Sequence, residues 1–367
     1  MAELFDFNDD LGPAKVVGIY EPRLPLKAIV VVDNVAAGPA IGGVRMAKDV
    51  SLAECFRLAR AMTLKNAAAG LPHGGGKSVI FADPSMTSTQ KQKVVRSFAR
   101  AIGQITDYIV GPDMGTNEEC MAWVFDEIGR SVGLPREIGG IPLDEIGATG
   151  FGVAVAAEAV EETGRLLLEG ARVAVQGYGA VGQHAARALQ ARGSIIVAIS
   201  DSQGAILNNA GLNLDDLDHH KSISGSVRDF PDADAIQPAD LVAVDCDIWI
   251  PAARPDVINR SNVDRLRAKV ILQGANIPVT RDAEQLLHDR GVLSVPDFIA
   301  NAGGVICAAV EYQGGTERQA FDAIAERTRR NTLEILSQSK KTGLDPRKAA
   351  ERMAVARVKI AMGFRRP

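Results

Sequence analysis

The chain has 367 residues, of which 46% are hydrophobic and 23% are charged, and its formal net charge is -4 at pH 7. This length suits two domains, because a single hydrophobic core rarely grows so large. Acidic and basic residues are interspersed along the chain, which argues against the basic surface of a nucleic-acid-binding protein.

The first ten residues, MAELFDFNDD, do not have the basic and then apolar layout of a signal peptide. The sequence contains no uninterrupted run of about 18 apolar residues, so no membrane span is predicted. Four cysteines lie far apart and form no CxxC pair, which predicts reduced thiols and no structural metal site. They are Cys55, Cys120, Cys246 and Cys307. We therefore expect a cytoplasmic protein that contains no metal.

In the first part of the chain, short apolar runs at 16–20 and 28–33 predict strands. Ser51 followed by Glu54 is typical of the capping box that begins a helix. Apolar residues continue at helical spacing as far as Met62. We therefore predict an α/β first domain with a helix beginning after Ser51.

Two lysines follow in an unusual setting. Lys65 comes three residues after Met62 and is therefore expected on the same helix face. Three glycines precede Lys77, and we expect them to expose the backbone to a ligand. A phosphate-binding P-loop is disfavoured because Leu71 stands where its first glycine is required, and because the segment follows a helix and not a strand.

The third candidate residue for a catalytic site, after the two lysines, is an acid at a turn. Asp113 follows the apolar run 108–110 within GPDMGT, which is a common setting for a catalytic carboxylate. Taken alone, Asp113, Lys65 or Lys77 would more often be a surface charge. The Gly- and Pro-rich segment REIGGIPLDEIGATG at 136–150 is the best candidate for a linker between domains.

The second part alternates apolar runs with helical stretches. The expected strands are 171–176, 194–201, 246–250, 269–273 and 292–295, and helices are expected at 317–337 and 346–364. Unbroken apolar strands joined by helices predict a parallel sheet covered on both faces.

A G-x-G-x-x-G motif follows the first of these strands and opens a helix, the context of a dinucleotide-binding site. Its residues are Gly177, Tyr178, Gly179, Ala180, Val181 and Gly182. Asp201 ends the next strand, where its carboxylate can accept hydrogen bonds from a ribose; the alternative is a solvated acid at a turn. No Lys or Arg flanks Asp201 in the sequence, which favours NAD over NADP.

Together the motifs GPAIGGVRM, MTLKNAAAGLPHGGGKS, GPDMGT, GYGAVG, GAN and PDFIANAGGVI resemble the glutamate/leucine/phenylalanine/valine dehydrogenase family. The resemblance spans about 38–311. It implies NAD-dependent, reversible oxidative deamination of an amino acid to a 2-oxo acid and ammonia by a homo-oligomer. It also implies a substrate-binding and oligomerisation domain at 1–143 and a Rossmann-like NAD-binding domain at 144–337. A cleft is expected between these domains, and a helix at about 338–367 should return to the first.

Roles for individual residues follow from the same resemblance. Lys65 should hold the substrate α-carboxylate, Lys77 should be the catalytic lysine, and Asp113 should exchange protons with the substrate nitrogen. Further residues expected at the substrate are Ile41, Gly42, Gly43, Met62, Gly111, Asn276 and Asn301. The cofactor should be bound by the glycine motif together with Asp201, Thr149, Ala252 and Asn276.

The type of substrate side chain is predicted from one position at which this sequence differs from the glutamate-specific members of the family. Glutamate-specific members resemble GPxKGG, with a lysine for the distal carboxylate, whereas this chain has Ile41 there. An unpaired buried carboxylate would cost several kcal/mol, so an apolar substrate of the phenylalanine, leucine or valine type is favoured. Gly111 leaves room for a large side chain. The alternatives are a glutamate dehydrogenase with an atypical distal site and a catalytically silent regulator that binds NAD or an amino acid.

Overall fold

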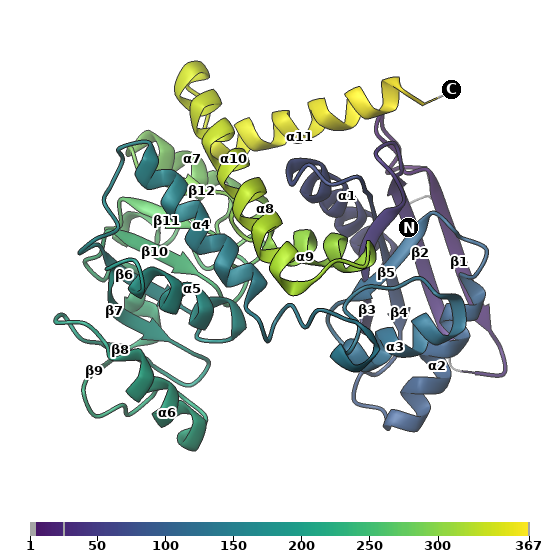
Figure 1. Ribbon diagram of the computed structural model, residues 1–367, viewed down its shortest axis with the longest axis horizontal. Coiled ribbons are helices and arrows are strands. Elements are labelled where there is room, and N and C mark those ends of the chain that lie inside the picture. Colours follow the sequence, from purple (N-terminus) through teal and green to yellow (C-terminus); the bar gives the residue numbers. More distant parts are fainter. Residues whose placement is uncertain (1–4, 25, 366–367) are drawn as a thin grey trace. The chain divides into compact units, whose positions relative to one another are not determined.

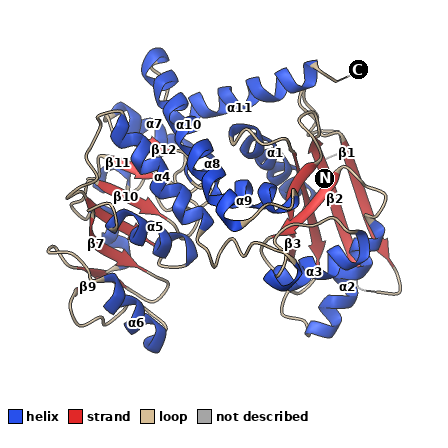
Figure 2. Ribbon diagram, in the orientation of Figure 1, coloured by secondary structure: helices blue, strands red, loops and turns tan. Residues whose placement is uncertain are grey.

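The computed structural model describes residues 5–24 and 26–365, which form two compact units (Figure 1). Unit 1 contains the chain up to Leu143, the segment Val305–Ala320 and the chain from Glu351 onward. Unit 2 contains Asp144–Gly304 and Phe321–Ala350. The chain thus enters unit 1 twice after leaving it, whereas the sequence predicted a single return at about 338. Both units combine helices and strands, which confirms the predicted α/β class (Figure 2).

Unit 1 is built on a five-stranded mixed sheet with the order β1-β2-β4-β3-β5. The pairs β1–β2 and β2–β4 are antiparallel, while β3 runs parallel to both β4 and β5. The strands are β1 (Lys15–Glu21), β2 (Leu26–Asn34), β3 (Ala40–Ala47), β4 (Gly74–Phe81) and β5 (Tyr108–Pro112). The predicted strands near residues 16–20 and 28–33 are confirmed, but β3, β4 and β5 were not predicted as strands.

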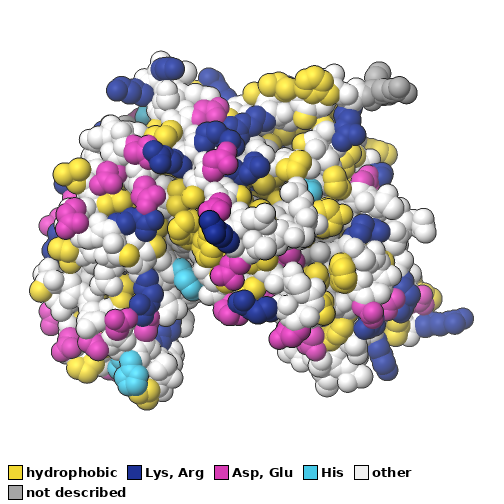
Figure 3. All heavy atoms as spheres, in the orientation of Figure 1, with side chains coloured by type: hydrophobic (Ala, Val, Ile, Leu, Met, Phe, Trp, Pro, Cys, Tyr) yellow, Lys and Arg dark blue, Asp and Glu magenta, His cyan; other side chains and the backbone are white. Residues whose placement is uncertain are grey.

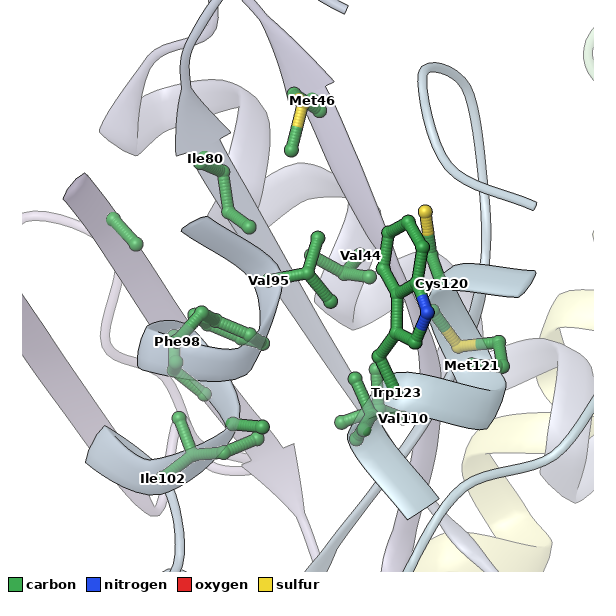
Figure 4. Packing of buried hydrophobic residues seen from close by; sticks show 14 of the residues in the cluster. Val44, Met46, Ile80, Val95, Phe98, Ile102, Val110, Cys120, Met121 and Trp123 are labelled. Carbon is green, nitrogen blue, oxygen red and sulfur yellow. The ribbon is translucent and has the colours of Figure 1, made fainter. Parts of the chain in front are cut away.

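Helices cover both faces of this sheet. Val31 and Val79 pack with α1 (Leu52–Ala68), whereas the alternate positions on the same strands pack with α2 (Ser88–Ala101) and α3 (Glu118–Ile128). This follows from the two-residue period of a strand, which sends successive side chains to opposite faces. Figure 4 shows the cluster on the face covered by α2 and α3, where side chains of these helices pack against those of the strands.

The predicted start of α1 is confirmed. Ser51 is its N-cap, and its hydroxyl oxygen accepts a hydrogen bond from the Glu54 backbone N–H at 3.1 Å. Such a cap satisfies one of the free N–H groups of the first turn and contributes about 1 kcal/mol to helix stability.

Unit 2 is built on a seven-stranded sheet with the order β12-β11-β10-β6-β7-β8-β9. Five strands are parallel, and they match the five predicted runs; the three-residue strands β8 and β9 pair antiparallel at one edge and were not predicted. The strands are β6 (Arg172–Gln176), β7 (Ile195–Ser200), β8 (Ala205–Leu207), β9 (Asp234–Ile236), β10 (Ile248–Pro251), β11 (Val270–Leu272) and β12 (Leu293–Val295).

The strand order reverses between β6 and β10, because the chain moves from β6 to β7 on one side and later returns to β10 on the other. In open α/β sheets, ligands bind at the carboxyl ends of the two strands that flank such a switch point. The G-x-G-x-x-G motif follows β6 directly, so the fold positions it where a dinucleotide site is expected.

The helices of unit 2 complete the alternation. They are α4 (Ala148–Glu162), α5 (Ala180–Gln190), α6 (Leu214–Ser224), α7 (Arg281–Asp289), α8 (Asp297–Ala300) and α10 (Glu317–Thr342). The helices α9 (Gly303–Tyr312), α10 and α11 (Pro346–Gly363) each contain residues of both units. The helices predicted at 317–337 and 346–364 are therefore confirmed. The predicted linker at 136–150 contains a short 3-10 helix, Arg136–Ile138, and ends inside α4.

The surface and the cysteines agree with the composition. On the face shown in Figure 3, basic side chains are interspersed with acidic ones. All four cysteines are buried and free of disulfide bonds. Within residues 5–24 and 26–365, no helix is both long and apolar enough to cross a membrane. The same residues contain no group of three or more His, Cys, Asp or Glu side chains arranged to hold a metal.

Candidate active site

The predicted catalytic lysine and acid form an ion pair. Lys77 lies on β4 and Asp113 directly follows β5, on either side of β3. The Lys77 Nζ atom lies 2.6 Å from Asp113 Oδ2, and Lys77 is only 6% exposed. Gly43 on β3 makes room for this pair, because a Cβ atom there would lie 3.2 Å from Lys77 Nζ and 2.8 Å from Asp113 Cβ. The fold thus brings together three residues that the sequence analysis selected.

A second cation, Arg45, reaches the same carboxylate and was not selected from the sequence. Its Nε atom lies 3.1 Å from Asp113 Oδ2, and its Nη1 atom lies 2.6 Å from Glu54 Oε1. Burial alone would raise the pKa of Asp113, but the charges of Lys77 and Arg45 outweigh it and lower that pKa below its ordinary value. Asp113 is therefore a carboxylate at neutral pH, able to accept a proton or a hydrogen bond from a neighbouring ammonium group.

The glycines before Lys77 have a different role from the one predicted. They belong to β4 and are buried, so the prediction that they expose the backbone to a ligand is wrong. A Cβ atom at Gly75 would lie 2.0 Å from the Thr63 backbone nitrogen on α1, and one at Gly76 would lie 2.9 Å from the Tyr108 ring. Gly75 therefore lets α1 approach the sheet closely, and Gly76 leaves room for the Tyr108 ring.

This close approach positions the other predicted substrate residues on α1. Thr63 contacts the strand, while Met62 and Lys65 beside it remain partly exposed near the C-terminal end of the helix. Gly42 also serves packing, because a Cβ atom there would lie 1.7 Å from the Gly76 carbonyl oxygen of β4.

The predicted specificity residue lies in apolar surroundings. Ile41, on β3, is 3% exposed and packs in one cluster with Ile109, Val132 and Ala308. Gly111 is buried, and a Cβ atom there would lie only 3.3 Å from Val132 Cγ2, so its lack of a side chain leaves room for Val132. The side chains that pack on Ile41 in this cluster are therefore apolar.

A buried acid that was not predicted holds one wall of this cluster. Glu311, on α9, accepts hydrogen bonds from the backbone N–H groups of Leu134 at 3.1 Å and Ile141 at 3.0 Å. Burial raises the pKa of Glu311 above its ordinary value despite these bonds. Its contacts tie the loop that carries Val132 to the helix that carries Ala308.

The glycine motif has the geometry that a dinucleotide requires. Gly177 adopts a φ of 93° and packs against the backbone of Ala252 and Ala253, while a Cβ atom at Gly182 would lie 1.9 Å from the Gly177 carbonyl oxygen. By contrast, nothing lies within 4 Å of a Cβ atom built at Gly179. The second glycine thus leaves open space beside the N-terminus of α5, which carries no side-chain cap and can bind a pyrophosphate.

The other residues assigned to the cofactor around this motif are Tyr178, Ala180, Val181 and Thr149. Tyr178 has a buried side chain, and its carbonyl oxygen accepts a hydrogen bond from Lys221, which was not predicted. Ala180 and Val181 form the first turn of α5. Thr149 lies in the first turn of α4 and is partly buried.

Both carboxylate oxygens of Asp201 already accept hydrogen bonds from the backbone. Its Oδ1 accepts the backbone N–H of Gln203 at 2.8 Å, and its Oδ2 accepts that of Val227 at 2.7 Å. Burial would raise the pKa of Asp201, but these hydrogen bonds lower it below its ordinary value. The fold also brings a basic residue here: the Arg228 side chain packs against Gly204. Asp201 has no basic neighbour in the sequence, but the fold places Arg228 close to the turn that follows it.

Asn276 and Asn301 lie together. The Asn301 Nδ2 atom donates to the Asn276 Oδ1 atom at 3.1 Å and to the carbonyl oxygens of Gly274 and Ala275 at 3.2 and 3.1 Å. Asn301 is 3% exposed, and its own Oδ1 atom is buried with no hydrogen-bond partner among the described residues. This amide thus holds the GAN loop and keeps a buried acceptor available.

His73 is buried beside the glycine strand and gives a testable pH dependence. Its Nδ1 atom hydrogen-bonds the Pro39 carbonyl oxygen at 3.1 Å, and burial lowers its pKa below 6.5. The unfolded chain therefore binds more protons just below pH 6.5, and stability falls as the pH is lowered through this range. We expect the thermal midpoint to fall between pH 7.5 and pH 5.5, and to fall less in His73→Gln, as measured by circular dichroism. An equal fall in both proteins would contradict this assignment.

Comparisons with known proteins identify the family of this chain. The dimerisation domain of the Glu/Leu/Phe/Val dehydrogenases matches residues 24–130, and the glutamate/leucine/phenylalanine/valine dehydrogenase domain matches residues 139–366. The glutamate dehydrogenase of Aeropyrum pernix is 37% identical over 356 residues, covering 90% of this chain and 85% of that protein. The NADP(+)-dependent glutamate dehydrogenase of Pyrobaculum calidifontis is 38% identical over 325 residues, covering 83% of this chain and 76% of that protein.

Two solved structures are also similar. One is the leucine-bound hetero-hexameric glutamate dehydrogenase of Thermus thermophilus, with a TM-score of 0.86, 27% identity and coverage of 97% of this chain and 90% of that chain. The other is the L-tryptophan dehydrogenase of Nostoc punctiforme, with a TM-score of 0.76, 26% identity and coverage of 96% and 97%. The chain therefore belongs to the glutamate/leucine/phenylalanine/valine dehydrogenase family and is an amino acid dehydrogenase.

Proposed function

We propose that this enzyme catalyses the reversible oxidative deamination of an apolar L-amino acid to a 2-oxo acid and ammonia. The observation that carries this proposal is the ion pair between the buried Lys77 and the half-buried Asp113, 2.6 Å apart, together with the cluster of apolar side chains around Ile41 on the strand between them. In this proposal unit 1 binds the amino acid and unit 2 binds the dinucleotide.

The proposed mechanism assigns a separate task to each charged group. Lys65 binds the substrate α-carboxylate, and Lys77 and Asp113 move protons between water and the substrate nitrogen. A bound nicotinamide cofactor supplies the hydride acceptor for the α-carbon. Asp113, ionised beside Lys77 and Arg45, first accepts the proton that the substrate ammonium group loses before hydride transfer. After hydride transfer the substrate is an iminium ion, and Lys77, as the neutral amine, takes a proton from the water that attacks it. Asp113 then returns its proton to the leaving nitrogen.

The side-chain preference has two candidates. The names of the sequence relatives favour glutamate, since both of those described above are glutamate dehydrogenases. The apolar neighbours of Ile41 support an apolar side chain, because Ile41 offers no charge to a distal carboxylate, and a carboxylate buried without a partner would cost several kcal/mol. The similarity to an L-tryptophan dehydrogenase also supports an apolar substrate. We propose an apolar substrate because the charge on a substrate must be neutralised where it is buried.

For the cofactor we propose NAD, held by the glycine motif, Thr149, Ala252 and Asn276. Asp201 would accept a ribose hydroxyl on the remaining lone pairs of its carboxylate, and its negative charge would repel a 2′-phosphate. Arg228 near Gly204 and the NADP(+)-dependent relative support NADP as a second candidate. Because the first domain matches the dimerisation domain of this family, we also propose that the protein is a homo-oligomer. We further propose that it acts in the cytoplasm.

The test is a comparison of initial rates at alkaline pH with phenylalanine, leucine, valine and glutamate, each with NAD and with NADP. We expect kcat/KM for one apolar amino acid to exceed that for glutamate by about tenfold or more, the size of a typical pocket discrimination. A higher value for glutamate would overturn the apolar proposal and place the distal carboxylate on another residue. Binding of NADH without turnover of any amino acid would overturn the proposed activity and favour a regulator.

A further inference from the structure

A buried network of charged side chains in unit 2 is not used by the mechanism above. Arg347, in the first turn of α11, is 9% exposed, and its carboxylate partners Glu284 and Asp297 are 4% and 6% exposed. The Arg347 Nε atom donates to Glu284, and its Nη2 atom donates to Asp297 Oδ1 at 2.8 Å and to Gln273 Oε1 at 2.9 Å. Burying three charged groups is unfavourable unless each is paired, so this arrangement calls for an explanation.

The network ends at the GAN loop. The second oxygen of Asp297, Oδ2, accepts a hydrogen bond from the Ile277 backbone N–H at 2.8 Å. Ile277 has a φ of 50°, a left-handed conformation that a β-branched residue rarely adopts. Asp297 therefore stabilises a strained turn directly after Asn276.

The same loop is held from its other end by Asn301. This amide binds the carbonyl oxygens of Gly274 and Ala275 and the side chain of Asn276. The side chain of Asn276 thus lies between two anchors, the Asn301 amide on one side and the Asp297–Ile277 bond on the other. Of the two, only the Asp297 anchor depends on a charged partner, Arg347.

We propose that Arg347 is a positioning residue for the nicotinamide: by holding Asp297 it fixes the turn at Ile277 and so the place of Asn276. This inference rests on the proposed function, in which Asn276 and Asn301 lie beside the nicotinamide ring. The adenosine half of the cofactor is assigned to the glycine motif and Asp201, and Arg347 does not contact either of them. A disturbance at Arg347 should affect the nicotinamide half alone.

The experiment uses full-length Arg347→Lys and Asp297→Asn proteins. Lysine keeps the charge but lacks the fork that reaches Glu284 and Asp297 together. Calorimetry gives Kd for NADH and for ADP-ribose, which has no nicotinamide, and steady-state rates give kcat. We expect Kd for ADP-ribose to change less than about twofold, Kd for NADH to rise about tenfold, and kcat to fall about 10- to 100-fold, as small misplacements of a reacting group do.

Arg290→Lys is the matched control. Arg290 lies in the same unit and donates to the carbonyl oxygens of Val263 and Leu266, but it does not reach the GAN loop. We expect it to lower the thermal midpoint without changing the ratio of the two dissociation constants. If one Arg347 or Asp297 variant cannot be isolated folded, the other carries the same test.

Two results would overturn the inference. Equal weakening of NADH and ADP-ribose would show a purely structural role for Arg347, and unchanged values for both ligands and for kcat would show no role. Either result leaves turnover by the wild-type enzyme, and hence the proposed function, untouched. Failure of the wild type to deaminate any amino acid would refute the proposed function, while the ratio of the two dissociation constants would still be measurable.

Discussion

Replacing Lys77 by methionine is expected to lower kcat for oxidative deamination by about 10³-fold, within the range found for loss of a general acid or base. Methionine has nearly the length of lysine and no charge, so the space beside Gly43 stays filled. Asp113 keeps Arg45 as a partner, and its carboxylate therefore remains ionised. The measurement is the steady-state rate with the preferred amino acid, together with Kd for NADH, which should change less than about twofold because unit 2 is not altered.

The matched control for this change is Lys91→Met. Lys91 also lies in unit 1, where its Nζ atom donates to the Gly115 carbonyl oxygen at 3.2 Å, two residues after Asp113. It makes no ion pair with Asp113, so we expect kcat to remain within about threefold of the wild-type value, as for a surface substitution. Turnover by Lys77→Met within tenfold of the wild-type rate would show that another group carries the proton.

The elements that were predicted correctly owe their form to nearby residues. Continuous apolar runs gave the five parallel strands of unit 2, and the Ser51–Glu54 spacing gave the start of α1. The Rossmann-like motif was recognisable because its three glycines serve one turn and one helix N-terminus within six residues. Local signals of this kind depend on a few consecutive side chains, and they survive without knowledge of the tertiary fold.

Two of the strands that were missed, β3 and β4, are rich in glycine for tertiary reasons. Gly42 and Gly43 on β3 and the glycine run on β4 would by themselves favour a loop. They are glycines because the backbone of a neighbouring strand or of α1 occupies the space of their side chains, as Gly75 against Thr63 illustrates. Nothing in the sequence around a glycine says which distant backbone will approach it, so these strands could not be predicted from local pattern.

The charged residues that were missed have distant partners. Arg45 meets Asp113, Glu311 meets the loop at Leu134, and Arg347 meets Asp297. Arg45 and Glu311 lie between apolar or aromatic residues in the sequence, whereas Arg347 lies beside Lys348 and looks like an ordinary surface charge. Because one charge alone is unstable in a core, such a residue implies a partner, but the sequence does not identify it.

Changing Ile41 to lysine is expected to shift the substrate preference toward glutamate. The new ammonium group would lie among Ile109, Val132 and Ala308. Glu311, on one wall of this cluster, already accepts two backbone hydrogen bonds, so we expect the new charge to take its anionic partner from the substrate. A distal carboxylate would supply that partner, whereas an apolar substrate would leave the charge buried and unpaired. We expect the ratio of kcat/KM for glutamate to that for the preferred apolar amino acid to rise by about 10²- to 10³-fold, equivalent to about 3–4 kcal/mol.

Ile41→Met separates charge from shape in this experiment. Methionine has the length of lysine without its charge, so it should change the two values of kcat/KM in parallel and by less than about tenfold, as volume-conserving core substitutions do. Parallel losses in Ile41→Lys and Ile41→Met would show that Ile41 acts only in packing and that the distal end of the substrate lies elsewhere. A rise for glutamate confined to Ile41→Lys would instead assign the side-chain specificity to this position on β3, because the only difference between the two variants is the charge that the substrate must neutralise.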